Sequence, residues 1–493
     1  MVDLIFAESR FGLGPRGGKP VAGSDPRGWA DSQLGRFRPA LPVAIPSRTQ
    51  VAENLIALNE ARRDMRQESG GPRQRAALAD PSMQANPAAA MMTPAAMPKP
   101  ERSPEVAAAA KAQRDSYTAM VGARMQSALT TDTPFAERMV HFWANHFAVA
   151  ANMQNTTGFG GLLEMEAIRP HVTGRFRDML FAVEQHPAML YYLNQAQSVG
   201  PNSPAGGRAN RAGKVRGLNE NLAREIMELH TLGVRTGYTQ ADVTEFARAL
   251  TGWTVGGMGR GPAGRMAQAQ PVAPGSFIFN AGLHEPGART IMGRRFPEGG
   301  EEQAAAVLDM FASHPATARH VATKLARHFT GDTPPPAMVD RLAQAFTASG
   351  GDLPTVYRAI VASPEAWNSA TPKFRDPWDW SVAALRAMDV TSLSPAATVQ
   401  MLKELGQPVW QPPAPSGWDD ITASWAGPDA LMRRVEAAQR MADEGGQGID
   451  ARALAPQILG SRLSQATGTA IARAESPKTG LAILLASPEM LRR

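Results

Sequence analysis

Cysteine is absent from this 493-residue chain. The absence excludes disulfides, thiolate zinc sites, iron–sulfur clusters and cysteine nucleophiles. It does not fix the compartment, because exported bacterial proteins also avoid stray thiols. Long apolar runs are absent too: nothing resembles the roughly 18 consecutive apolar residues that indicate a transmembrane helix. The opening residues, MVDLIFAESRFGLGPRGG, lack a basic segment followed by an apolar one. No signal peptide is therefore predicted, and a cytoplasmic location is expected.

Several catalytic and cofactor motifs are also missing. The sequence has no GxSxG, Walker A or HExxH motif and no GxGxxG in a Rossmann context. Serine hydrolase, P-loop NTPase, zincin and dinucleotide functions therefore have no support. Haem, flavin, NAD and iron–sulfur clusters have no signal either, and the cofactor is unknown. The net charge is only +6, from 51 basic and 45 acidic residues. Because no Lys/Arg run accompanies this excess, nucleic-acid binding is not expected.

Apolar residues recur at three- and four-residue spacing between the loops. This period predicts a mainly α fold, which we expect to be one large, irregular helical domain over residues 1–493. The β signal is thin. Residues 277–279 and 290–296, joined through GLHEPGAR, predict one small β-hairpin.

Three segments rich in Gly, Pro and Ala interrupt the helical pattern. Residues 66–112 are predicted to be a disordered insertion. Residues 199–214 and 255–275 are predicted to be flexible loops that flank the polar motif described next. Such loops are either mobile elements of a site or unconstrained surface insertions.

The densest polar motif spans residues 217–254, GLNENLAREIMELHTLGVRTGYTQADVTEFARALTGWT. Asn219 can cap a helix over 220–232, and Gly233 supplies its left-handed stop. Helical geometry puts Glu225 about 60° from the apolar stripe of this helix, which predicts a half-buried side chain. A carboxylate in that position must be hydrogen-bonded, charge-paired or metal-bound, or must carry a raised pKa.

Two interpretations of Glu225 stay open. Glu225 and Asn221, on one flank, either tie the helix to neighbouring loop backbone or act in catalysis or ligand binding. Glu228 lies further round this flank, and Arg224 is four residues from it, in the weaker orientation for a helical ion pair. His230 faces the opposite flank. It can share a small site with Glu225 only if another element bridges the gap.

Other aromatic and histidine residues also allow two roles each. Trp253, at the end of the motif, is either a core residue or a substrate platform. His284, in the predicted hairpin loop, is either an acid/base or ligand residue or an exposed turn histidine. The tryptophans of the segment LGQPVWQPPAPSGWDDITASW either wall a sugar or peptide site or anchor a Pro-rich loop; they are Trp410, Trp418 and Trp425.

The segment FAERMVHFWANHF places several polar residues on one helix. Glu137, His141 and Asn145 share one face, and His146 lies on the next. A Glu and a His four residues apart can supply two metal ligands, so divalent metal binding is one option. The other is a set of satisfied His and Asn side chains in the core. Asn145 and His146 are candidate binding residues.

A series of motifs runs along nearly the whole chain: in order, RFGLGPR, FWANHF, HPAMLYYLNQAQSVGPNS, the polar motif from NENLAREI onward, FIF…HEPG…IMG, HPATARHVATKLARHF, GDLPTVYRAIVASPEAW, LGQPVWQPPAPSGWDD and LASPEMLRR. Through these motifs the chain resembles one bacterial family, known only as a domain of unknown function, number 1800. The family typically has Asp after the hairpin histidine, whereas this chain has Glu285. That departure weakens any role that needs a short carboxylate there.

The resemblance implies a bacterial and often exported protein. Members of the family tend to be encoded beside a second family that resembles sulfatases and alkaline phosphatases and often carries a twin-arginine signal. A partner of that kind is therefore implied. As an alternative to the cytoplasm, the resemblance implies a periplasmic or secreted location, reached by export with the signal-bearing partner.

Two functions are expected from the sequence. The first is a helical binding or assembly subunit that acts with the sulfatase/phosphatase-like partner, using exposed Trp and Met residues. The alternative is an enzyme, a hydrolase or lyase acting on a glycan or polymer, with or without a metal. In the enzyme, Glu225 is the general base or ligand, and His146, His230 or His284 assists. This hypothesis requires those side chains to converge on one solvent-connected pocket.

Overall fold

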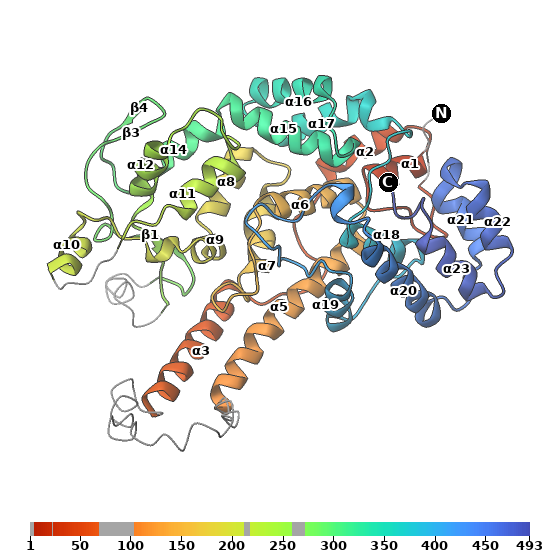
Figure 1. The fold of residues 1–493 in the computed structure, drawn as a ribbon, viewed down its shortest axis with the longest axis horizontal. Coiled ribbons are helices and arrows are strands. Elements are labelled where there is room, and N and C mark those ends of the chain that lie inside the picture. The colour runs from red at the N-terminus through yellow and green to blue at the C-terminus, as the bar shows by residue number, and fades with distance from the viewer. Residues whose placement is uncertain (1–3, 22, 69–102, 212–216, 259–271) are drawn as a thin grey trace, which may run out of the picture.

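The computed structural model describes residues 4–21, 23–68, 103–211, 217–258 and 272–493. Helices dominate this part of the chain and its strands are few and short (Figure 1), so the mainly α prediction is confirmed. None of the helices described here is long and apolar enough to cross a membrane.

The elements alternate short and long helices with a few irregular turns; two of them, η3 and η6, are π-helical. The first half of the chain contains α1 (Leu4–Arg10), α2 (Pro26–Arg36), α3 (Arg48–Glu68), α5 (Pro104–Thr130), α6 (Pro134–His146), α7 (Gly160–Leu162), η3 (Leu163–Ile168), η4 (Arg169–His171), α8 (Phe176–Glu184), α9 (Pro187–Tyr192), η5 (Gln195–Gln197), α10 (Pro204–Arg211), α11 (Asn221–Glu225), η6 (Ile226–His230) and α12 (Gln240–Leu250). The second half contains β1 (Trp253–Val255), β2 (Phe277–Phe279), β3 (Arg289–Ile291), β4 (Arg294–Phe296), α14 (Glu301–Ala312), α15 (Pro315–Thr330), α16 (Pro336–Ser349), α17 (Leu353–Ala362), η7 (Pro364–Trp367), α18 (Pro377–Ala387), α19 (Pro395–Glu404), η8 (Thr422–Ser424), α20 (Pro428–Gly445), α21 (Ala451–Leu459), η9 (Gly460–Arg462), α22 (Gln465–Ala472) and α23 (Pro477–Ala486).

Helix α15 illustrates how the sequence sets these elements. His314 precedes it, and the Nδ1 atom of His314 accepts a hydrogen bond from the N–H of Ala316 at 3.1 Å. Pro315 occupies the first helical position, where a missing N–H costs nothing. Val321 and Leu325, four residues apart, are buried on one face. The other face of α15 does not pack in the core and carries polar side chains.

The main core surrounds α6, which lies near the middle of the molecule (Figure 1). Phe135, Trp143 and Phe147 are fully buried there. The indole N–H of Trp143 donates to the Tyr357 hydroxyl at 2.6 Å, so its one polar atom is satisfied. Removing a buried aromatic side chain of this kind costs about 3–5 kcal/mol, so α6 is a rigid base for whatever its polar residues do.

A second, smaller core joins α18 to the C-terminal helices. Trp380 of α18 is fully buried, and its indole N–H donates to the carbonyl of Leu485 in α23 at 3.0 Å. Ala438 of α20 and Leu481 of α23 pack in the same cluster. Because α18 contacts both cores, its N-terminal end is held between them.

Helices α3 and α5 run side by side and project away from the body of the molecule (Figure 1). They enclose the predicted insertion over 66–112. Residues 66–68 and 103 onward belong to these helices or their caps, so the structure continues helix into both ends of that segment. Residues 69–102 lie outside the described residues.

The two predicted loops are also partly ordered. Residues 204–211 of the segment 199–214 form α10, and the rest of that segment after 211 lies outside the described residues. Of the segment 255–275, residue 255 belongs to β1, and residues 259–271 lie outside the described residues.

The prediction of a single hairpin from 277–279 and 290–296 is wrong. Strand β2 pairs instead with β1, and β3 pairs with β4, each antiparallel. The segment taken as one strand contains its own two-residue turn, because Met292 and Gly293 both have positive φ, 49° and 75°. Two such residues match the twist of a tight hairpin. Asp242 fixes this turn by accepting a hydrogen bond from the N–H of Met292 at 2.6 Å.

The segments at the two ends of the chain meet beside α18 (Figure 1). Lys373 and Arg493 exchange two main-chain hydrogen bonds, at 2.9 and 2.8 Å. The guanidinium of Arg493 also donates to the carbonyl of Arg10 in α1 at 2.9 Å. These bonds bring Arg493 into the interior, next to the cavity described below.

Candidate functional site

The helix predicted over 220–232 is divided. It is α-helical up to Glu225 and π-helical over 226–230. Glu225 is partly buried, and burial raises the pKa of its carboxyl group. The helix begins at Asn221, with Glu220 rather than the predicted Asn219 at the N-cap position. Asn221 is exposed, and its N–H donates to the side chain of Asn219 at 2.8 Å, so Asn219 still satisfies one main-chain donor of the first turn.

Three further residues of the motif lie in a surface network or in the core. Arg224 bonds to Glu228 at 3.4 Å and to Gln240 at 2.8 Å, on a partly exposed face where such pairs contribute little to stability. Trp253 is fully buried, with its ring 5.2 Å from that of Phe277. The structure therefore places Trp253 in the core.

His284 is packed inside the fold. Its Nδ1–H donates to the carbonyl of Thr251 at 2.8 Å, and only 7 % of the residue is exposed. The neighbouring Glu285 accepts a hydrogen bond from the N–H of Asn202 at 2.8 Å and another from its side-chain amide at 2.5 Å. Together these bonds fasten the segment before α10 to the end of α12.

His230 and its neighbours form a hydrogen-bond chain that leads to α6 and α15. The Nδ1–H of His230 donates to Glu184 at 2.8 Å. The carbonyl of His230 accepts from Nε2–H of His146 at 3.1 Å, and the carbonyl of Leu229 accepts from Nε2–H of His320 at 3.0 Å. The last carbonyls of a helix have no partner within it, so these two histidines cap η6. The bond also fixes the tautomer of His146, whose buried Nδ1 has no hydrogen-bond partner.

A cavity of about 340 Å³ lies at this capped end of η6, between α6, α15, the start of α18 and the segment 407–420. Charged, aromatic and amide side chains line it: Arg124, Arg138, His141, Phe142, Asn145, His146, His320, Lys324, Arg327, His328, Phe374, Asp376, Trp378, Asp379, Gln407, Trp410, Trp418, Asp419, Asp420 and Arg493. Two of the predicted site residues, Asn145 and His146, are among them. The others do not line it: Asn221, Arg224, Glu225, Glu228, His230, Trp253 and His284.

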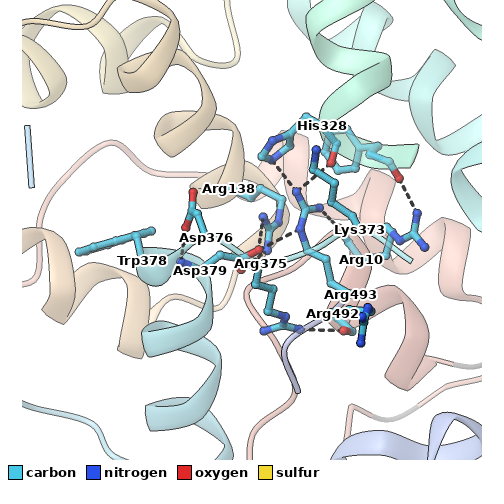
Figure 2. Close-up of polar contacts among 12 residues, drawn as sticks. Arg10, Arg138, His328, Lys373, Arg375, Asp376, Trp378, Asp379, Arg492 and Arg493 are labelled. Atoms are coloured by element: carbon cyan, nitrogen blue, oxygen red, sulfur yellow. Dashed lines mark hydrogen bonds and ion pairs between the residues drawn. The ribbon is translucent and has the colours of Figure 1, made fainter. Parts of the chain in front are cut away.

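One wall of the cavity is a buried network centred on Asp379 (Figure 2). Asp379 accepts two hydrogen bonds from Arg138, at 2.7 and 3.3 Å, and pairs with Nε of Arg493 at 2.9 Å. Burial would raise the pKa of Asp379, but Arg138, Arg375 and Arg493 outweigh it and hold the pKa well below its usual range. The carboxylate is therefore fully committed to holding these arginines in place.

His328, beside this network, is held as a neutral ring. Its Nδ1–H donates to Asp420 at 3.0 Å, and its Nε2 accepts from Arg493 at 3.2 Å. Burial and the nearby Arg493 lower its pKa to about 4. The other oxygen of Asp420 pairs with Lys373 at 3.0 Å, so both of its oxygens are occupied.

Tryptophans supply apolar surface on another side. Trp378 and Trp410 line the cavity, and the guanidinium of Arg124 lies 4.0 Å from the ring centre of Trp378. Arg124 also pairs with Glu164 at 2.8 Å, and the indole N–H of Trp410 donates to the same carboxylate at 2.8 Å. These contacts fix the two rings in place, with Arg124 lying over the ring of Trp378.

The segment that carries Trp418 is joined to α6 by a pair of reciprocal bonds. The side-chain amide of Asn145 donates to the carbonyl of Trp418 at 2.8 Å and accepts from its N–H at 2.7 Å. Gly417, with φ of 84°, permits this close approach, because a Cβ there would overlap the main-chain oxygen of Asn145. Trp425 packs behind Trp418, with ring centres 5.8 Å apart.

Two cations of α15 that line the cavity lack partners. The side chains of Lys324 and Arg327 form no hydrogen bond or ion pair with any residue that the structure describes. The other three cations of the lining, Arg124, Arg138 and Arg493, are each paired with a carboxylate. Burial lowers the pKa of Lys324 to about 8, with Arg327 also lowering it and Asp420 opposing. The two cations of the cavity that are not ion-paired therefore both lie on α15.

The candidate metal ligands of α6 are engaged in an ion-pair cluster. Glu137 pairs with Arg169 and lies 3.6 Å from His141. Although burial alone would raise it, these neighbours lower the pKa of Glu137 to about 2. Within the described ranges, no group of three or more His, Asp or Glu residues is arranged to hold a metal ion.

Sequence reasoning missed the contribution of α15. Its segment HPATARHVATKLARHF repeats polar residues four apart, at His320, Lys324 and His328. In a helix this spacing puts the three on one face, beside the apolar stripe. This repeat can be recognised in the sequence alone, and it indicates a polar face on α15.

Comparison with known proteins gives a family but no named relative. No curated protein and no solved structure matches the chain. The family model described as "Protein of unknown function (DUF1800)" matches residues 7–492. The match includes every residue that lines the cavity except Arg493, which directly follows it. The chain therefore belongs to the DUF1800 family.

Proposed function

We propose that the cavity binds a hydroxyl-rich ligand that carries an acidic group, such as the acidic end of a glycan. The observation that carries this proposal is the pair of unpartnered cations on α15, in a cavity whose other cations are all ion-paired. A partly buried charge without a partner is costly, and a carboxylate, sulfate or phosphate group offsets that cost. Lys324 and Arg327 therefore hold the acidic group.

The remaining lining suits the rest of such a ligand. Trp378 and Trp410 contribute apolar ring surface to the cavity, which a sugar ring can contact. Asp376 and Asp419 form no ion pair with any residue of the described chain, so their oxygens can accept hydrogen bonds from hydroxyl groups. The cavity thus recognises an anion at α15 and neutral polar groups elsewhere.

Calorimetric titration with glucuronate and glucose tests the proposal, because the two sugars differ by the carboxylate. We expect glucuronate to bind and glucose to bind at least tenfold more weakly. Losing one charge-assisted bond costs about 1.5–3 kcal/mol, so Lys324→Met and Arg327→Met each weaken glucuronate binding roughly 10- to 100-fold.

Arg319→Met is the matched control for these variants. Arg319 lies on the same helix, but it is exposed and pairs with Asp340 at 2.7 Å, away from the cavity. Its loss is expected to leave binding unchanged. Equal binding of the two sugars, or equal losses in all three variants, overturns the proposal. Elemental analysis of the same samples tests the divalent metal that the sequence left as one option.

The assembly role remains a second proposal. Met432 and Val435 of α20 lie three residues apart and are 59 % and 50 % exposed, which gives a partner an apolar contact. We propose this helix as the contact for a sulfatase/phosphatase-like partner, with export in its company rather than residence in the cytoplasm. Co-expression followed by fractionation tests both points. Met432→Lys should abolish co-purification, and purely cytosolic protein in the presence of the partner contradicts export.

The enzyme alternative that uses Glu225 is also testable, although the convergence it requires is not met at this cavity, which only His146 of that set lines. Its support is the partly buried position of this carboxylate and its raised pKa. Glu225 does not line the cavity, so Glu225→Gln is expected to leave glucuronate binding intact. If hydrolysis or elimination of an acidic glycan is detected, loss of turnover in that variant would assign the base to Glu225.

A further inference from the structure

We propose that Lys324 is a nucleophilic lysine, and that its amine forms an imine with an anionic aldehyde or ketone held in the cavity. Suitable ligands are 2-oxo acids and the open-chain forms of acidic sugars. The inference rests on the proposed function for the anionic part of the ligand and adds the carbonyl group to its description.

The position of Lys324 leaves its amine available. The residue lines the cavity, and its side chain forms no hydrogen bond or ion pair with any residue that the structure describes. Asp420 is the carboxylate that acts on it electrostatically, but the oxygens of Asp420 are occupied by His328 and Lys373. The lone pair of a neutral Lys324 therefore has no competing protein partner.

The surroundings of Lys324 make its neutral amine easier to form than that of an ordinary lysine. Burial is the main cause, and Arg327 on the next turn of α15 adds like charge, while Asp420 opposes the shift; together they hold the pKa of Lys324 at about 8. Burial also lowers the pKa values of the nearby His146 and His320, although their bonds to backbone carbonyls oppose that shift, so both rings are neutral. A desolvated lysine beside a second cation is a recognised setting for an amine nucleophile.

Lys373 provides a contrast within the same region. It is only 1 % exposed and pairs with Asp420 at 3.0 Å, while its ammonium also donates to the carbonyl of Asp420 at 2.6 Å. Its three protons are thus needed for structure. The side chain of Lys324 is only partly buried and has no such bonds, so its amine is not tied to the structure as that of Lys373 is.

The reaction is balanced without an added oxidant or reductant. The Nζ lone pair of Lys324 attacks the carbonyl carbon and forms the C–N bond, while the carbonyl π electrons move to oxygen. The two amine protons then leave with that oxygen as water, and the nitrogen lone pair forms the C=N bond. Arg327, three residues further along α15, holds the carboxylate so that the adjacent carbonyl faces the amine.

Reductive trapping tests the inference on the full-length folded protein. The protein is incubated with glyoxylate, an anionic aldehyde, and cyanoborohydride near pH 7, and its eight lysines are mapped by peptide mass spectrometry. Formaldehyde serves as the neutral probe. With a pKa of about 8, Lys324 has roughly two orders of magnitude more neutral amine at that pH than an ordinary lysine. We expect it to be alkylated at least tenfold faster than the exposed Lys403.

Two variants make the test specific. Lys324→Arg keeps the positive charge but has no amine to alkylate. We expect rapid alkylation at residue 324 to disappear and alkylation of the other lysines to stay unchanged, with circular dichroism used to check that the variant is folded. Arg327→Met should lower the glyoxylate-to-formaldehyde rate ratio at Lys324 by at least fivefold, because formaldehyde has no carboxylate to hold. That ratio cancels any change in the amine itself.

The outcomes separate this inference from the proposed function. If Lys324 reacts no faster than Lys403 while glucuronate still binds, the nucleophile is refuted and the binding function stands. If Lys324 reacts fast but Arg327→Met leaves the ratio unchanged, the anionic carbonyl substrate is refuted, and the anion site of the proposed function is refuted with it.

Discussion

The Nε2–H of His146 donates to the main-chain carbonyl of His230 across 3.1 Å. This bond joins the conspicuous polar motif to the cavity, because His146 lines the cavity and His230 ends the π-helix. The polar motif therefore reaches the cavity through the C-terminal end of η6, and the carboxylate of Glu225 does not line the cavity.

Replacing His146 with Phe keeps a planar ring and removes the donor. The carbonyl of His230 is then buried without its partner, and we expect the free energy of unfolding to fall by about 1–3 kcal/mol. Urea denaturation measures the change. His146→Gln, which retains a side-chain N–H, should recover part of it. Equal stability of His146→Phe and the wild type would show that the cap is not needed.

Asp379→Asn removes the charge that Arg138 and Arg493 share. Because two buried guanidinium groups lose their counterion, we expect a loss of about 3–5 kcal/mol in unfolding free energy. The control is Asp389→Asn, since Asp389 pairs with Lys19 at 2.7 Å on the surface, where a pair contributes about 0–1 kcal/mol. Comparable losses in the two variants contradict the assigned role of Asp379.

Acidification is expected to destabilise the protein from about pH 6.5 downward. Burial lowers the pKa of both His320 and His328 from 6.5 to about 4. Between these values the unfolded chain binds protons that the folded protein does not, so stability falls as pH falls and this effect levels off below about 4. Glu137, with its pKa lowered from 4.5 to about 2, adds a further loss below about 4.5.

Urea titrations between about pH 7 and pH 4 measure this loss, which we expect to be about 1–3 kcal/mol for each histidine. In His328→Asn, the unfolding free energy should depend less steeply on pH above pH 4, because the contribution of one histidine is removed. A slope that is the same in wild type and variant would argue against a neutral, buried His328.

Gly417→Ala tests the contact between the Trp418 segment and α6. A Cβ at Gly417 would overlap the main-chain oxygen of Asn145 and push the segment outward. We expect glucuronate binding to weaken at least tenfold, with Trp418 fluorescence shifted to longer wavelength. Gly237→Ala is the matched control, because Gly237 has a similar φ of 95° with open space around it. If both variants bind normally, the segment does not shape the cavity.

Much of the fold could be predicted from the sequence because it depends on local pattern. The apolar period of α15 and the Thr239–Asp242 capping box of α12 are both readable within a few residues, and both are present. Which strands pair with each other could not be predicted from such local patterns. The partner of 277–279 is β1, more than twenty residues earlier, and nothing in either strand identifies the other.

The site was predicted only in part for a similar reason. Asn145 and His146 stood out because their own helix is dense in polar residues, and both line the cavity. Glu225 was as prominent in the sequence, but a carboxylate can be half-buried for structural reasons alone, so its burial does not identify a site. Lys324 and Arg327 matter because no carboxylate pairs with them, and a missing partner can be recognised only once the surrounding elements are in place.

The bonds that bring Arg493 against Arg10 and Asp379 have a consequence for folding kinetics. Residues 10 and 493 are 483 positions apart, and Arg138 and Asp379 are 241 apart. Contacts between such distant residues are slow to form, because closing long loops loses chain entropy before any stabilising contact is gained. The helical body is therefore expected to fold first, and ligand binding should return later than helical content during refolding.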